Sequence, residues 1–128
     1  MKRLTRAEEQ IMQVLWKIGK GFVNDILEQL PEPKPAYTTV STIIRILEKK
    51  QFVSYKAFGK THEYFPIVTR KQYAGSMFRN LLSNYFENSP PSLASFLTRE
   101  ENISLEDLVE IRKIMDEEID KIKSEDND

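Results

Sequence analysis

In the N-terminal half of the chain the hydrophobic pattern changes period near residue 52, and this change limits the folds open to this half. Before that point apolar residues recur at spacings of three and four, which predicts helices. Two stretches rich in aromatic and β-branched residues follow, 52–58 and 61–65, separated by the hairpin signal Gly59-Lys60. Three helices followed by a β-hairpin, the wing, is the element order of a winged helix-turn-helix. We therefore predict a mainly α fold of this type for the N-terminal half.

The predicted helices of this half have recognisable start and stop signals. Thr5 and Glu8 form a capping box at the start of the first helix. The second helix starts near Asn24 and is stopped by Pro31. A proline-rich loop, which cannot be helical, then leads into the third helix. Trp16, in the first helix, is expected to pack in the core.

The third helix, residues 36–50, has two contrasting faces. One is an apolar stripe with the spacing of a buried face, formed by Val40, Ile43, Ile44 and Leu47. The opposite face opens with hydroxyl and β-branched residues, which are mediocre helix formers, so helix propensity does not explain their presence. Short hydroxyl side chains let a helix approach a groove closely, and they can donate to phosphate oxygens or base edges. Such a face is typical of a DNA recognition helix.

The predicted DNA-binding surface combines this face with the wing. In the major groove we expect Thr38, Thr39, Ser41, Thr42 and Arg45, and on the phosphate backbone Tyr37, Lys49, Lys56 and Lys60. Arg45 suits a bidentate guanine contact, but a phosphate contact is equally compatible with the sequence. The two wing lysines fit either phosphate contacts or a solubilising role at an exposed strand edge, and the sequence leaves both interpretations open.

The net charge of −1 averages two halves of opposite sign. Residues 1–71 carry 13 lysines and arginines against 7 acidic residues, and residues 72–128 carry 6 against 13. A basic half suits a polyanion such as DNA, whereas an acidic half would repel it. The alternative is that these charges are only solvated faces.

Three further helices are predicted after the hairpin, with caps at Thr69, Ser89 and Ser104. Their apolar side chains are too many for one short chain to bury beside the first core, so a partner surface is expected. The simplest partner is a second copy, giving a two-fold dimer that would meet a palindromic DNA site; the alternative is that these helices fold back on the N-terminal domain. We therefore predict a winged-helix DNA-binding domain, residues 1–68, and a helical dimerisation domain, residues 69–128. The expected dimerisation residues are Phe78, Leu82, Leu93, Phe96, Leu97, Leu108, Ile111 and Met115.

The sequence offers little for catalysis or metal binding. It has no cysteine, and its only histidine, His62, is expected to be exposed on the second strand without companions for a metal site. Acidic pairs near the C-terminus could form a carboxylate metal site, but a solvated helix face is the favoured interpretation. We expect no enzyme, no metal and no cofactor. Because no apolar run approaches the roughly 20 residues that span a bilayer, we also expect no membrane insertion and a cytoplasmic location.

Two longer motifs carry a resemblance to a known family. They are LTRAEEQIMQVLWK, residues 4–17, and TTVSTIIRILEKKQFV, residues 38–53, and the hairpin with Tyr64 and Pro66 after its turn supports them. With these motifs the chain resembles, over nearly its whole length, the penicillinase-repressor family of bacterial winged-helix regulators, the BlaI/MecI group.

The resemblance implies a homodimer, joined through its C-terminal helices, that binds palindromic operators. It also implies repression of an antibiotic-resistance operon, typically for β-lactams. In that family a membrane sensor with a zinc protease domain leads to cleavage of the repressor at an Asn-Phe bond in the dimerisation region. The nearest match here is the bond between Ser95 and Phe96, which keeps Phe but not Asn.

Within the recognition helix, Thr39 and Thr42 match positions where the family carries Thr, whereas Tyr37 and Thr38 depart from its Pro-Lys. The resemblance therefore implies an altered base preference. Copper-responsive relatives carry C-terminal cysteines, so their absence argues against copper sensing. The leading hypothesis is a homodimeric transcriptional repressor. A winged-helix protein-interaction module without sequence-specific DNA binding is the alternative, and a carboxylate-metal nuclease is a distant third.

Overall fold

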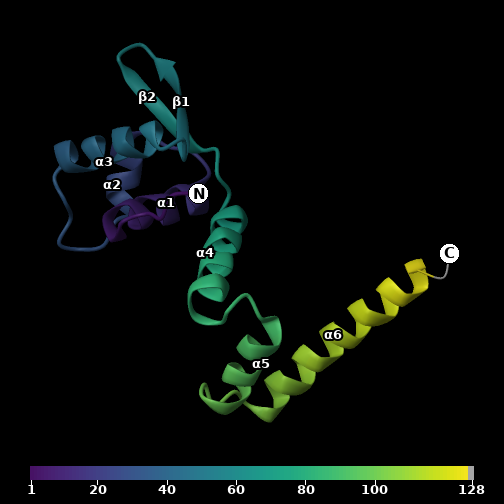
Figure 1. Cartoon of the computed structure of the whole chain (residues 1–128). Helices are drawn as coiled ribbons and strands as arrows, with labels where there is room; N and C mark the ends of the chain where they lie inside the picture. Colours follow the sequence, from purple (N-terminus) through teal and green to yellow (C-terminus); the bar gives the residue numbers. More distant parts are fainter. Residues whose placement is uncertain (127–128) are drawn as a thin grey trace. The chain divides into compact units, whose positions relative to one another are not determined.

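The structure, a computed structural model, describes residues 1–126. It divides into two compact units, Met1–Phe78 and Arg79–Asp128. The first contains helices α1 (Arg6–Ile18), α2 (Val23–Gln29) and α3 (Tyr37–Lys49), followed by strands β1 (Val53–Phe58) and β2 (Thr61–Pro66) (Figure 1). The two strands form a two-stranded antiparallel sheet. This is the predicted winged helix-turn-helix, and the mainly α fold class is confirmed.

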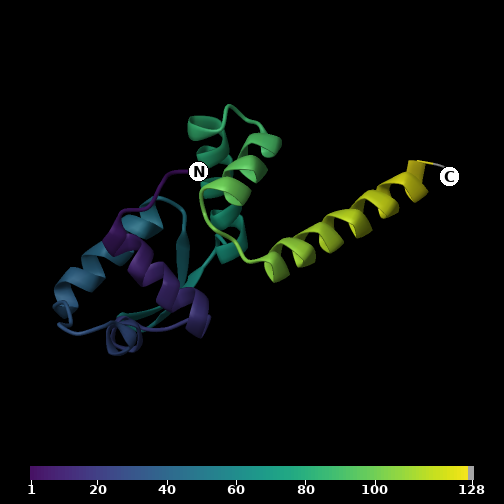
Figure 2. The same cartoon turned by 90° about the horizontal axis from the view of Figure 1, so that it is seen from below.

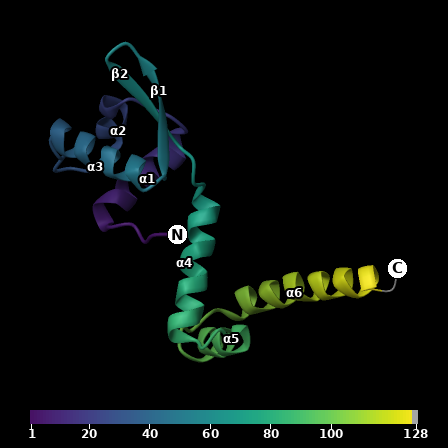
Figure 3. The same cartoon turned by 45° about the horizontal axis from the view of Figure 1, so that its top comes forward.

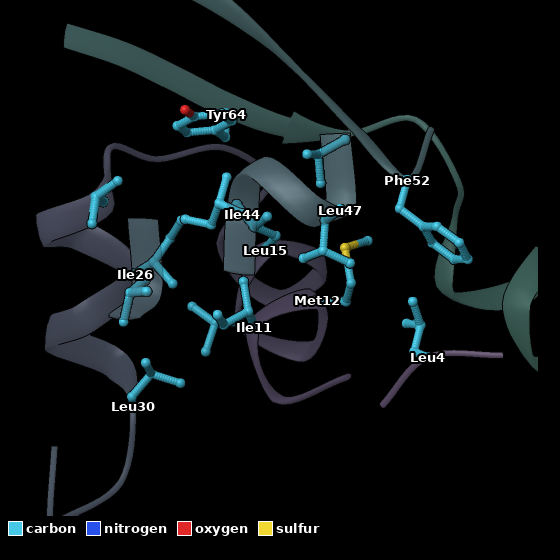
Figure 4. Packing of buried hydrophobic residues seen from close by; sticks show 14 of the residues in the cluster. Leu4, Ile11, Met12, Leu15, Ile26, Leu30, Ile44, Leu47, Phe52 and Tyr64 are labelled. Carbon is cyan, nitrogen blue, oxygen red and sulfur yellow. The ribbon is translucent and has the colours of Figure 1, made fainter. Parts of the chain in front are cut away.

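One apolar core, to which all three helices contribute, lies inside the first unit (Figure 4). Its fully buried members include Ile11, Met12 and Leu15 of α1, Ile26 of α2, Val40, Ile44 and Leu47 of α3, and Phe52. The predicted apolar face of α3 is therefore confirmed, with Ile43 only half-buried at its border. Each buried aliphatic side chain stabilises the fold by about 1.5–3 kcal/mol. The core thus holds α3 with its opposite face turned to solvent.

A buried ion pair joins the start of α1 to the end of α3. Lys50 Nζ lies 2.7 Å from Glu8 Oε1 and 2.8 Å from Glu8 Oε2, and the Glu8 side chain is only 5% exposed. The predicted capping box is also present, because the Thr5 N–H donates to the Glu8 carboxylate and the Glu8 N–H donates to the Thr5 hydroxyl. Burial raises the pKa of Glu8, but the hydrogen bonds from Lys50 and Thr5 outweigh burial and lower this pKa below its ordinary value. An ionised carboxylate therefore fastens two helices together.

The wing is joined to the helical part by backbone hydrogen bonds and by side-chain contacts, among them the edge-on packing of Phe58 against Phe22. The predicted two-residue turn, Gly59-Lys60, joins β1 to β2, and Gly59 has a φ of 64°, which glycine adopts without a steric cost. Tyr64 of β2 and Gly21, in the turn between α1 and α2, exchange two backbone hydrogen bonds of 2.8 and 2.9 Å. From this point the hairpin projects away from the three helices (Figure 3).

Helix α4 (Arg70–Tyr85) begins in the first unit and continues into the second. In its first turn the Tyr73 hydroxyl accepts a hydrogen bond from the Leu4 N–H at 3.0 Å. Trp16 packs against the core as expected, half-buried, and its indole N–H donates to the Val68 carbonyl at 2.8 Å. The start of α4 therefore belongs to the packing of the first unit, while the functional division at residue 68 stays a prediction.

The second unit contains α5 (Pro90–Arg99) and α6 (Leu105–Asp126). The predicted caps are present, since the Ser89 hydroxyl accepts from the Ser92 N–H and the Ser104 hydroxyl from the Asp107 N–H. Helix α6 is one uninterrupted helix (Figure 2), and neither α5 nor α6 has a buried residue among those the structure describes. Large apolar side chains are exposed along α6: Leu105, Val109, Ile111, Ile114, Met115, Ile119 and Ile122. Within residues 1–126 no helix has the length and apolar character needed to cross a membrane.

Candidate nucleic-acid interface

The solvent face of α3 is formed by the residues predicted to contact DNA. Opposite the buried stripe, Thr38, Thr39, Thr42, Arg45 and Lys49 are exposed, and Ser41 is half-buried. At about 100° per residue these side chains cover the half of the helix that faces away from the core. The structure therefore presents a polar, uncovered helix face with one arginine and one lysine.

The hydroxyl group of Thr42 is engaged within the helix. It donates a hydrogen bond to the Thr38 carbonyl oxygen at 2.9 Å, one turn earlier. The hydroxyl proton is therefore not available to a ligand, which can contact only the hydroxyl oxygen, as an acceptor, and the methyl group. The predicted donation from Thr42 to a phosphate or a base requires this local bond to open.

A hollow of about 590 Å³ lies between α3, the start of α2 and the wing. Four of the predicted residues line it, namely Tyr37, Ser41, Arg45 and Lys60. The other five, Thr38, Thr39, Thr42, Lys49 and Lys56, do not line it. The predicted surface is therefore divided into an outward-facing part of α3 and a part that faces the wing.

The charges in this hollow are mixed. Besides Arg45 and Lys60, it is lined by the carboxylates of Asp25 and Glu48. Asp25 is engaged, because it accepts a hydrogen bond from the Phe22 N–H at 2.9 Å. Burial raises the pKa of the Tyr64 hydroxyl deeper in the hollow, and the Glu48 carboxylate raises it further, whereas Arg45 opposes this rise. A phosphate entering the hollow would meet two cations and, beside them, the repulsion of Glu48.

The wing has aromatic side chains that the sequence reasoning did not assign to the surface. Tyr55 and His62 stack with ring centroids 3.9 Å apart and planes at 4°. His62 is therefore half-buried, which makes the expectation of an exposed imidazole wrong; the cross-strand diagonal to Tyr55 covers one of its faces. The signal was available in the turn position, because a two-residue turn sets the strand register and hence the diagonal neighbours.

The two wing lysines differ in their surroundings. Lys56 Nζ lies 5.3 Å from the centroid of the Phe58 ring, a cation–π contact, and Phe58 packs edge-on against Phe22 of the helical part. Lys60 lies at the exposed turn. Lys60 lines the hollow, whereas Lys56 does not and lies over the Phe58 ring.

The residues predicted for dimerisation and cleavage lie in α4, α5 and α6. Phe78, Phe96, Ile111 and Met115 are exposed, whereas Leu82, Leu93, Leu97 and Leu108 are half-buried. Ser95 is half-buried inside α5, and its carbonyl oxygen accepts from the Thr98 hydroxyl at 3.0 Å. The bond that follows Ser95 is thus a helical peptide bond. Their roles in assembly and cleavage stay predictions.

Comparison with known proteins identifies the family. The family model described as Penicillinase repressor matches residues 4–117. The methicillin resistance regulatory protein MecI of Staphylococcus aureus (strain N315) is 24% identical over 113 residues, which are 88% of this chain and 92% of that protein. MecI of Mammaliicoccus sciuri is 23% identical with the same coverage. A solved structure named "CopR Repressor Structure" is 31% identical and has a TM-score of 0.44, with 52% of this chain and 97% of that chain covered. Because the family model spans most of the sequence, this chain belongs to the penicillinase repressor family.

Proposed function

We propose that this chain represses transcription as a homodimer that binds palindromic operators, and that it is not an enzyme. The family and the relatives named as regulators support the coarser statement, a transcriptional repressor of the penicillinase-repressor type. The observation that carries the proposal is the face of α3, which is held on a buried core, lined with hydroxyl groups and Arg45, and flanked by a wing with two lysines. Such a face fits the major groove, with the wing on the adjacent backbone.

In this proposal the divided surface has two tasks. The outward part, with Thr38, Thr39 and Thr42, lies over base edges. Arg45 and Ser41 face the wing and lie at the edge of the groove, where Arg45 can reach a guanine or a phosphate. The residues that hold the backbone are Tyr37, Lys49, Lys56 and Lys60.

Homodimerisation is supported by the apolar side chains that α6 leaves exposed in a single copy. Ile114 and Met115 are 59% and 58% exposed, and Ile111 and Ile119, four residues before and after Met115 on α6, are apolar and exposed as well. A contiguous apolar helix face of this kind marks an interaction surface, and a second copy would cover it symmetrically. Two recognition helices related by a two-fold axis would then require an inverted-repeat operator.

We further propose an antibiotic-resistance operon as the target, proteolysis in the dimerisation region as the release step, a membrane sensor protease as a partner, and the cytoplasm as the location of this chain. The relatives' name, methicillin resistance regulatory protein, supports the first part. The candidate bond between Ser95 and Phe96 lies inside α5. Because a protease cleaves a transiently opened helix, the cleavage rate should follow the local opening of α5.

Selection of binding sites from a randomised duplex library, with the full chain near physiological salt, tests the proposal. We expect inverted half-sites with centres about 34–36 Å apart, one turn of the double helix, and an affinity that falls steeply with salt because several phosphates are neutralised. No enrichment even at low salt would favour the alternative, a winged-helix protein-interaction module. Cleavage of the duplex on addition of magnesium would contradict the absence of enzymatic activity.

A further inference from the structure

The solvent face of α3 includes one large apolar side chain that none of the functions above uses. Ile46 is 42% exposed, although the neighbours Ile44 and Leu47 are fully buried. It lies four residues after Thr42 and three before Lys49, spacings that place side chains on the same side of a helix. Ile46 is therefore part of the outward face of the recognition helix, away from the hollow beside the wing.

The surface around Ile46 is more apolar than the residue types of its neighbours suggest. The Thr42 hydroxyl donates to the Thr38 carbonyl at 2.9 Å, so the Thr42 side chain offers a methyl group and an acceptor but no free proton. Thr39, seven residues before Ile46, adds a second methyl group on the same side. At a rise of 1.5 Å per residue, this strip extends about 10 Å along the helix, or about three base pairs at 3.4 Å each.

An apolar strip on a DNA-reading face has one complementary feature in the major groove. The C5-methyl group of thymine is the apolar group that base pairs display there, whereas the cytosine amino group and the guanine acceptors need polar partners. A cytosine or guanine edge opposite Ile46 would lose its water without gaining a hydrogen bond, which disfavours it. An isoleucine on this face can therefore distinguish bases only by contact with a methyl group, not by hydrogen bonding.

We propose that Ile46, with the methyl group of Thr42, reads a thymine methyl group in each operator half-site. This inference rests on the proposed function, because it requires α3 to occupy the major groove. It adds a specificity-determining residue to that function and predicts the chemical group recognised.

Replacement of thymine by deoxyuridine, which lacks only the C5-methyl group, tests this inference on the operator recovered by site selection. Each thymine of one half-site is replaced in turn, and the affinity of the full chain is measured by fluorescence anisotropy. We expect one position, or two adjacent ones, where the loss of the methyl group weakens binding about fourfold, the value of one buried methyl group. With Ile46→Ala this position should lose its sensitivity, so that thymine and deoxyuridine bind equally.

Ile67→Ala is the matched control, because Ile67 is also exposed, at 49%, and lies after the wing rather than on α3. This variant should keep the full response to deoxyuridine. The inference is overturned if no thymine responds, or if Ile46→Ala leaves the response unchanged. In both cases sequence-specific binding by the wild type would leave the proposed function standing. Failure to recover any operator would instead refute the proposed function itself, and with it this inference.

Discussion

Replacement of Lys50 by methionine should destabilise the first unit strongly, because it leaves the Glu8 carboxylate buried without its cation. That carboxylate is 5% exposed and would lose contacts of 2.7 and 2.8 Å, keeping the hydrogen bond from the Thr5 N–H. Breaking a buried ion pair typically costs about 3–5 kcal/mol. Since Lys50 is itself 22% exposed and the Thr5 bond remains, we expect the lower end, about 3 kcal/mol. Lys49→Met, an exposed neighbour, should change stability by at most about 0.5 kcal/mol.

The pH dependence of the stability lost in Lys50→Met tests whether the buried Glu8 carboxylate causes the loss. In the wild type the pKa of Glu8 is lowered by folding from its ordinary value of about 4.5, so the pair contributes its full stability above that value and loses it as the pH falls through the folded pKa. In Lys50→Met burial dominates, so Glu8 takes up a proton readily and the penalty should shrink between pH 7 and pH 4. Urea unfolding followed by Trp16 fluorescence measures the difference at both pH values. A loss that matches Lys49→Met, or one that is the same at both pH values, would refute the reasoning.

Three further predictions concern function. Arg45→Ala should weaken operator binding by about 1–3 kcal/mol while Arg79→Ala, which removes an exposed arginine of α4, does not; equal affinities in a titration would remove Arg45 from the interface. Glu48→Gln should tighten binding by about 0.5–1 kcal/mol at low salt, because a carboxylate leaves the hollow that faces the backbone, and an unchanged affinity would place the phosphates elsewhere. Met115→Asp should weaken the dimer by about 2–4 kcal/mol, because the Met115 side chain, 58% exposed in a single copy, would be lost from the apolar interface in both copies. Sedimentation equilibrium measures the dimer affinity, with Lys113→Asp as the control, and an unaltered affinity would exclude this face of α6 from the interface.

Features that depend on neighbours in the sequence could be predicted well. The caps at Thr5, Thr69 and Ser104 are hydrogen bonds across three residues, so the residue types at that spacing suffice to predict them. The apolar face of α3 and the hairpin turn follow in the same way, from a helical period and from a two-residue turn. The start of α2 differs by one residue, because Phe22 and Asp25 rather than Asn24 make the local bond.

Features that depend on distant residues could not be predicted. Glu8 and Lys50 are 42 positions apart, and a periodic pattern contains no information about which cation reaches a buried carboxylate. The hollow likewise requires the spatial meeting of α2, α3 and the wing, so the proximity of Glu48 to the expected phosphate contacts escaped the sequence reasoning. Ile46 differs from these features, because the helical period that predicts the buried stripe of α3 also leaves Ile46 outside it, so its exposure could have been predicted from the sequence.

Contacts at both ends of the wing limit how far its turn can move. The Gly21–Tyr64 pair holds one end, and Phe58, next to the turn, packs against Phe22 of the helical part. The distance along the strand from Tyr64 to Lys60 is about 13 Å at 3.3 Å per residue, so a tilt of about 10° about the Gly21–Tyr64 pair would displace the turn by about 2 Å, close to the difference between a direct phosphate contact and one through water. The Phe22–Phe58 contact and the stacked rings of Tyr55 and His62 oppose such a tilt, and they would thus set how far the wing can follow DNA whose backbone path varies between operators.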